Sequence, residues 1–155
     1  MNNDVTIERY GLEKYDQVVK YLHKIDKIFP DPMSSRVNIE EHMIKLFSRG
    51  IVVVALKSDE ICGILLGYIN DEQLKRAYLA TLGVSAEAQS MGVGTELLKT
   101  FIKMAKEKSM DYIGLHAHRD NIRAIKFYKR HGFEETQDNQ KPYEKSVYLT
   151  KRIYR

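Results

Sequence analysis

The stretch AEAQSMGVGTELLKTF, residues 86–101, changes character halfway along. Its first half carries Gln89 and two glycines, Gly92 and Gly94, whereas its second half is apolar at helical spacing. The first turn of a helix leaves backbone N–H groups unpaired, and the helix dipole places partial positive charge there. Glycines remove the side chains that would keep an anion away from those groups. We therefore expect residues 89–95 to form a cradle that binds a pyrophosphate.

Two common phosphate-binding motifs do not fit this stretch. A Walker loop ends in Gly-Lys-Ser/Thr, but Gly94 is followed by Thr95 and Glu96. A dinucleotide fingerprint needs a third glycine at position 97, where this chain has Leu97. Taken alone, the glycines suit a tight strand-to-helix connection equally well.

Working outward, the apolar patterns predict an alternation of strands and helices on both sides of the cradle. The expected order mixes an antiparallel meander with a parallel strand-helix-strand crossover, which indicates an α/β sheet with helices on both faces. Strands are expected at 5–11, 51–57, 61–69, 77–84, 111–118 and 146–153, helices at 12–28, 38–49, 95–108 and 121–132, and a further short strand near Phe133.

Composition and charge limit the classes of function. A length of 155 residues favours one domain over residues 1–155. The net charge of +4 arises from interleaved basic and acidic residues without a basic arm, so no nucleic-acid partner is implied. Cys62 is the sole cysteine, so an internal disulfide or a cysteine-based metal cluster is impossible, and we expect no metal. The beginning of the chain lacks a signal-peptide layout and no apolar run reaches ~18 residues, which favours a cytoplasmic location without membrane contact.

Two segments together resemble a known family. VSAEAQSMGVG, residues 84–94, resembles the Gln/Arg-x-x-Gly-x-Gly/Ala motif of the GCN5-related N-acetyltransferase (GNAT) family. NIRAIKFYKRHGF, residues 121–133, resembles its second signature, Asn-x-x-Ala-x-x-Phe-Tyr-x-x-x-Gly-Phe. The two motifs stand in the family's order with a strand between them. The resemblance implies a mixed, mostly antiparallel sheet in which two parallel strands, here 77–84 and 111–118, splay apart around acetyl-coenzyme A.

The resemblance also implies how the cofactor is held. Backbone groups of Leu82 and Val84 would bond the pantetheine arm as a further strand does, and Asn121 would contact the cofactor. Asn121 equally suits the N-cap of the following helix, a role that Asp120 could also fill. The pyrophosphate would lie in the cradle, formed by Gln89, Met91, Gly92, Val93, Gly94 and Thr95.

Tyr128 is the expected general acid. Asn121, Ala124 and Tyr128 are three and seven residues apart, which places them on one helical face. A phenol with an ordinary pKa of ~10 stays protonated at neutral pH and can protonate a departing thiolate. In the family that the chain resembles, the tyrosine at this position has that role. The alternative role for Tyr128 is structural, as an aromatic packed beside Phe127.

The general base is not assigned. Many members of the family place a glutamate on the strand before the cradle, but residues 77–84 contain no carboxylate. Glu72, His116, His118 and a water chain all stay open as the base.

The acceptor is expected between residues 29–36 and 136–145, and is either a small-molecule amine or a peptide or protein amine. The sequence does not decide between a monomer and a homodimer. A non-catalytic acyl-coenzyme A sensor of the same fold would need the cradle but not the acid, so Tyr128 argues against it. A nucleic-acid-binding domain would require a basic stripe with stacking aromatics, whereas the ten tyrosines are scattered.

Overall fold

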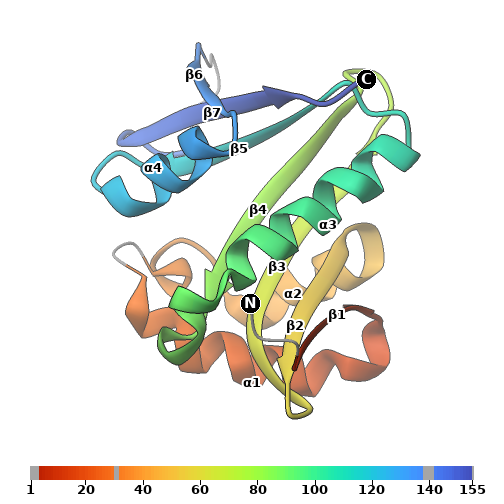
Figure 1. Cartoon of the computed structure of the whole chain (residues 1–155), viewed down its shortest axis with the longest axis vertical. Coiled ribbons are helices and arrows are strands. Elements are labelled where there is room, and N and C mark those ends of the chain that lie inside the picture. Colours follow the sequence, from red (N-terminus) through yellow and green to blue (C-terminus); the bar gives the residue numbers. More distant parts are fainter. Residues whose placement is uncertain (1–3, 30–31, 138–141, 155) are drawn as a thin grey trace.

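The computed structural model describes residues 4–29, 32–137 and 142–154. Its centre is a seven-stranded sheet with the strand order β1-β2-β3-β4-β5-β7-β6 (Figure 1). Neighbouring strands are antiparallel except for the parallel pair β4 and β5, which confirms the predicted mixed α/β sheet. The strands are β1 (Val5–Tyr10), β2 (Ile51–Lys57), β3 (Glu60–Asp71), β4 (Arg76–Val84), β5 (Tyr112–His118), β6 (Glu134–Thr136) and β7 (Ser146–Arg152).

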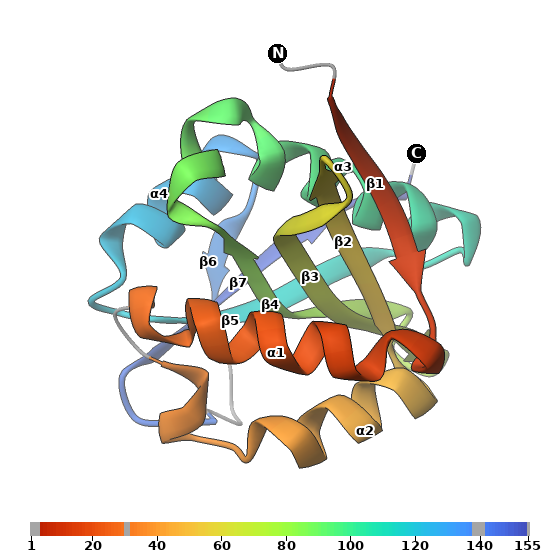
Figure 2. The same cartoon turned by 90° about the horizontal axis from the view of Figure 1, so that it is seen from below.

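Helices cover both faces of the sheet. The α1–α2 pair lies on one face and α3 on the other, with α4 beside β5 (Figures 1 and 2). The α-helices are α1 (Tyr15–Ile25), α2 (Ile39–Arg49), α3 (Val93–Glu107) and α4 (Ile122–Arg130). Short 3₁₀ turns are η1 (Leu12–Lys14), η2 (Asp26–Ile28), η3 (Met33–Ser35) and η4 (Ala86–Met91). No helix in these described ranges is long and apolar enough to cross a membrane.

Each face of the sheet has its own hydrophobic core. Large side chains of α3, such as Phe101 and Leu97, are fully buried against one face together with Tyr128 of α4. Leu22 of α1 and Leu46 of α2 are buried against the opposite face. This second core is built entirely from residues between 10 and 80.

The two parallel strands, β4 and β5, are paired over only part of their length. The pairing of β4 with β5 runs from Arg76↔Tyr112 to Leu79↔Leu115 and then stops. Beyond that point β4 continues to Val84 beside β3, and β5 continues to His118 beside β7. Figure 1 shows the two strands diverging toward α4 and the start of α3. The splayed pair that the resemblance implied is therefore present.

The connection from β4 to α3 depends on one glycine. After β4 the chain makes the 3₁₀ turn η4, and Gly92 then adopts a left-handed conformation with φ of +76° before α3 begins at Val93. A residue with a side chain is strained at such a φ, so glycine is favoured there for its backbone. Helix α3 thus starts two residues earlier than the sequence pattern predicted.

Candidate functional site

Two cavities meet where β4 and β5 diverge. The larger, of about 490 Å³, extends toward the start of α3, and the smaller, of about 100 Å³, extends toward the segment between α1 and α2. The residues that line both are Phe29, Leu82, Asn121, Ala124 and Tyr128. These five residues therefore form the junction of a two-chambered site.

The residues of the predicted cradle lie at and just before the start of α3. No described side chain caps this helix, and its first backbone bond runs from the N–H of Glu96 to the carbonyl of Gly92 at 3.1 Å. The backbone N–H groups of residues 93–95 come before that first helical bond, so they have no partner within the helix. Of the predicted cradle residues, Gln89, Gly92, Gly94 and Thr95 line the larger cavity, whereas Met91 and Val93 do not. Val93 is instead buried in the core beneath α3.

The open edge of β4 supplies further backbone groups. The N–H of Ser85 donates to the carbonyl of Cys62 on β3 at 2.9 Å. Because backbone groups alternate along a strand, those of Leu82 and Val84 face away from β3, toward the opening. The carbonyl of Val84 there accepts a hydrogen bond from Nε2 of Gln89 at 3.2 Å. Leu82 and Val84 both line the larger cavity.

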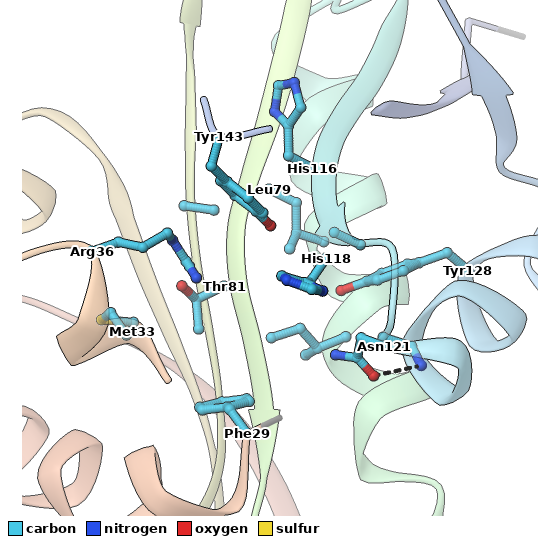
Figure 3. Close-up of a pocket in the computed structure, with 14 residues that line it drawn as sticks. Phe29, Met33, Arg36, Leu79, Thr81, His116, His118, Asn121, Tyr128 and Tyr143 are labelled. Carbon is cyan, nitrogen blue, oxygen red and sulfur yellow. Dashed lines mark hydrogen bonds between the residues drawn. The ribbon is translucent and has the colours of Figure 1, made fainter. Parts of the chain in front are cut away.

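Asn121 is the N-cap of α4. Its Oδ1 accepts a hydrogen bond from the N–H of Ala124 at 3.2 Å, which Figure 3 shows as a dashed line. Asp120 does not fill this role, and its own N–H donates to Nδ1 of His118 at 3.1 Å. Capping uses only the oxygen of the Asn121 amide, so its NH₂ group is not used by the cap. The capping role and a contact with a cofactor are compatible.

Tyr128 lies at the junction of the two cavities. Only 6% of its surface is exposed, and its ring packs edge-on against Phe127 and Phe133 with centroid distances of 5.3 and 5.5 Å. The hydroxyl has no hydrogen-bond partner in the described part of the chain, and Figure 3 shows it pointing toward His118 and away from α4. Burial raises the pKa of the phenol above its ordinary value of 10.0, so the group is a proton-bearing donor at neutral pH.

The candidate bases differ in whether they line one of the two chambers. Glu72 lies in the turn between β3 and β4 and lines neither chamber, whereas His116 and His118 both line the smaller one. Nδ1 of His118 accepts from a backbone N–H, so its neutral ring carries the proton on Nε2. Nδ1 of His116 instead lies 2.6 Å from the hydroxyl of Tyr78, which can donate or accept, so both tautomers of His116 are possible.

Several residues that line the two cavities were not predicted from the sequence. Arg123 and Arg130, seven residues apart on α4, line the larger cavity and give its outer wall positive charge. Phe29 and Arg36, from the segment between α1 and α2, line the smaller one, where the guanidinium of Arg36 lies 5.0 Å from the ring centroid of Tyr143. The seven-residue spacing of the two α4 arginines is the sequence signal that could have identified them.

The described side chains that line the smaller cavity are not acidic. Its described lining contains Arg36 and no carboxylate. Asp26 is buried and accepts from the N–H of Ser34, and Glu40 bonds His23 at 2.7 Å, so neither faces the chamber. Asp31 lies outside the described residues. Within the described ranges, no group of three or more histidine, cysteine, aspartate or glutamate side chains could hold a metal ion.

The site thus combines the start of α3, two diverging parallel strands and a buried tyrosine hydroxyl between two chambers. The sequence model of the acetyltransferase (GNAT) family matches residues 17–133. The chain therefore belongs to the GNAT family.

This chain is similar in sequence or in structure to proteins from several organisms. The probable N-acetyltransferase san of Drosophila melanogaster is 28% identical over 130 residues, which cover 82% of this chain and 68% of that protein. Naa50 of Arabidopsis thaliana, solved in complex with the bisubstrate analogue CoA-Ac-MVNAL, is 25% identical with a TM-score of 0.75, covering 96% of this chain and 98% of that one. A GNAT acetyltransferase from Staphylococcus aureus Mu50 is 18% identical with a TM-score of 0.79, covering 96% and 99%.

Proposed function

We propose that this protein is an N-acetyltransferase that moves the acetyl group of acetyl-coenzyme A to a primary amine. The observation that carries the proposal is the position of Tyr128, whose unpartnered hydroxyl lies between the phosphate cradle and the second chamber. The amine attacks the thioester directly, and the thiolate of coenzyme A leaves beside the Tyr128 hydroxyl.

Acetyl-coenzyme A fits the larger cavity by charge and by shape. Its pyrophosphate binds the amide groups of residues 93–95 at the positive end of α3, and Arg123 and Arg130 balance the remaining phosphate charge. Its pantetheine arm runs along the open backbone edge at Leu82 and Val84, which places the thioester near Tyr128. The bisubstrate analogue CoA-Ac-MVNAL in the complex of the Naa50 neighbour supports this choice of donor.

Tyr128 acts as the general acid. Burial keeps the Tyr128 phenol protonated at neutral pH, so its O–H can donate to the sulfur as negative charge develops there. The sulfur receives the hydrogen bond as the carbon–sulfur bond breaks. Phe127 and Phe133 hold the ring edge-on and keep the hydroxyl directed at the junction.

We propose His116 as the group that receives the amine proton, directly or through one water molecule. In the tautomer that donates Nδ1–H to the Tyr78 hydroxyl, Nε2 of His116 carries no proton and can act as a base. His118 is unsuited to this step because its Nδ1 is engaged and its Nε2 carries the proton. His118 then serves as a hydrogen-bond donor beside Tyr128.

The acceptor is an amine without a dense positive charge, since the described lining of the smaller chamber is cationic and aromatic. A polycationic amine would meet Arg36 there. The peptide-bearing analogue in the Naa50 complex makes peptide α-amines the first acceptors to test.

The decisive experiment measures release of coenzyme A thiol from acetyl-coenzyme A with a panel of peptides and small amines. We expect amine-dependent thiol release above the rate of hydrolysis, together with acetylated product by mass spectrometry. Binding of coenzyme A without transfer to any amine in the panel would favour the sensor. Failure to bind coenzyme A, measured by calorimetry, would overturn both.

A further inference from the structure

A third cavity lies at the end of β4 opposite to the splay. It has a volume of about 310 Å³ and lies between the last turn of α2, the end of β3 and the start of β4. Its lining residues are Lys45, Arg49, Tyr68, Asn70, Asp71, Arg76 and Tyr78. Neither chamber of the transfer site includes any of these seven residues.

The charge of this cavity is not balanced by the residues around it. Three cationic side chains line it against one carboxylate, and none of the three forms an ion pair within residues 4–29, 32–137 and 142–154. Oδ1 of the carboxylate, Asp71, accepts the N–H of Leu74 at 3.0 Å across the β3–β4 turn. An excess of positive charge in a concave surface attracts anions.

Arg76 has hydrogen-bonding capacity that the protein does not use. Its Nη1 donates to the hydroxyl of Tyr148 at 3.0 Å, and its guanidinium stacks 5.2 Å from the ring centroid of Tyr78. Its Nε is buried and has no hydrogen-bond partner in the described structure. A buried donor on a charged group is costly to leave unbonded. The edge formed by Nε and Nη2 matches the two oxygens of a carboxylate or phosphate.

The basic residues of α2 are not explained by helix capping alone. Lys45 and Arg49 are exposed at its carboxyl end, where positive charge complements the helix dipole. The carbonyl of Arg49 is already satisfied by Nδ2 of Asn70 at 3.0 Å, and that of Leu46 by the N–H of Gly50 at 2.8 Å. The side chains of Lys45 and Arg49 nevertheless line the same cavity as Arg76.

We propose that this cavity binds an oxyanion, a carboxylate or a phosphate group, between Arg76 and the last turn of α2. Its position suggests two sources for the anion. Ala80 of β4 lines the smaller chamber. It lies four residues after Arg76, which is about 13 Å along a strand. An extended peptide spans that distance with about four residues. An acidic side chain of the acceptor can therefore reach the cavity, and a free anion can bind there as well.

The site adjoins the proposed base. Arg76 bonds Tyr148, whose ring stacks on His116 at 4.7 Å, and it stacks on Tyr78, which bonds the same histidine. An anion at Arg76 is thus two contacts away from His116. The part of the proposal that assigns the anion to the acceptor rests on the proposed transfer function, whereas the part that predicts anion binding does not.

The binding test is a titration of the ¹⁵N-labelled protein with inorganic phosphate at constant ionic strength, followed by amide chemical shifts. We expect saturable shifts at residues 45–49 and 68–78. In a Lys45→Gln/Arg49→Gln variant the dissociation constant should rise by about tenfold or more, as the loss of charged hydrogen bonds predicts. Arg76→Lys, which keeps the charge but loses the planar edge, should weaken binding as well. Lys24→Gln, in the last turn of α1, is the matched control and should bind as wild type does.

Shifts confined to residues 89–95 and 119–131, or shifts that grow linearly without saturation, would overturn the site. Wild-type phosphate affinity in the Lys45→Gln/Arg49→Gln variant would overturn it too. The source of the anion is then decided by the KM of two peptide acceptors that differ only by Glu or Gln at the fourth residue. A lower KM for the Glu peptide that disappears in the double variant assigns the anion to the acceptor. Equal KM values with saturable phosphate binding assign it to a free anion.

Discussion

The hydroxyl of Tyr78 on β4 lies 2.6 Å from Nδ1 of His116 on β5. Tyr78 belongs to the stretch in which the two strands pair, and His116 is the first residue of β5 beyond the last pair, Leu79↔Leu115. The bond therefore anchors the ring of His116 at the point where the sheet opens. A histidine held this way is oriented before any acceptor arrives.

His116→Gln should lower kcat with a good peptide acceptor by at least about tenfold, because base catalysis is lost. The rate of this variant should rise with pH as the amine loses its proton in solution. Tyr78→Phe should reduce kcat less, since it removes only the anchor of the ring. Steady-state kinetics from pH 6 to 9 provide the check. Equal losses in His116→Gln and His118→Gln would contradict the assignment of the base.

Tyr128→Phe should reduce kcat by about 10²–10⁴-fold while the KM for acetyl-coenzyme A changes little. The substitution keeps the ring contacts with Phe127 and Phe133, and the hydroxyl that it removes bonds no described residue, so the fold should be unaffected. The loss should shrink with a thioester whose thiol is more acidic, because a better leaving group needs less protonation. Tyr154→Phe, near the end of the chain and exposed, is the matched control. A kcat within about threefold of wild type would remove Tyr128 as the acid.

The two glycines of the cradle should respond differently to substitution. Gly92→Ala should cost about 1 kcal/mol of unfolding free energy, because φ is +76° there although a Cβ would meet nothing within 4 Å. At Gly94 a Cβ would make only ordinary contacts, 3.5 Å from Phe127 and 3.7 Å from Val84, so Gly94→Ala should be tolerated. Gly94→Val places further methyl groups in the larger cavity and should weaken coenzyme A binding. Calorimetry that finds wild-type affinity in folded Gly94→Val would argue against the cradle.

Desulfo-coenzyme A should bind and stabilise the fold in a thermal-shift measurement. The expectation follows from the phosphate contacts proposed at residues 93–95 and at Arg123 and Arg130, none of which would involve sulfur. If only the intact thioester raised the melting temperature, phosphate recognition would not be the main source of affinity.

His42 should make the fold less stable in mild acid. Burial, aided by the charges of Lys45 and Arg36, lowers the pKa of His42 below its ordinary value of 6.5. Below that pH the unfolded chain therefore binds more protons than the folded one, so the unfolding free energy falls as pH drops. Urea unfolding at pH 7.5 and 5.5 should show a smaller decrease in His42→Gln than in wild type. Parallel decreases in both proteins would show that His42 has no such effect.

The sequence predicted most of the fold because its periodic segments agree with their environment. The alternation at 5–11 and the helical spacing at 95–108 each match one buried face, and both elements formed within a few residues of the expected bounds. The start of α3 was missed by two residues because the left-handed conformation of Gly92 fixes it, and a glycine alone does not specify its φ.

The site was predictable only where one segment supplies several of its groups. The cradle at 89–95 and the face of Asn121 and Tyr128 are local, so spacing along the chain was sufficient to group them. The pairing of Tyr78 with His116 joins residues 38 positions apart, and Arg36 meets Tyr143 across more than a hundred. The first contact depends on β4 lying beside β5 and the second on β7 lying beside β5, and no local pattern reports either neighbour.

The division of the interior into two separate cores has a consequence for how this protein can change over time. The core beneath α1 and α2 uses only residues between 10 and 80, whereas the core beneath α3 supports the start of that helix and the ring of Tyr128. Substitutions at Met33, which lines the smaller chamber and belongs to the first of these cores, are thus absorbed on one side of the sheet. New acceptors can be acquired through substitutions on that side, while α3 and Tyr128 on the other side are inherited unaltered.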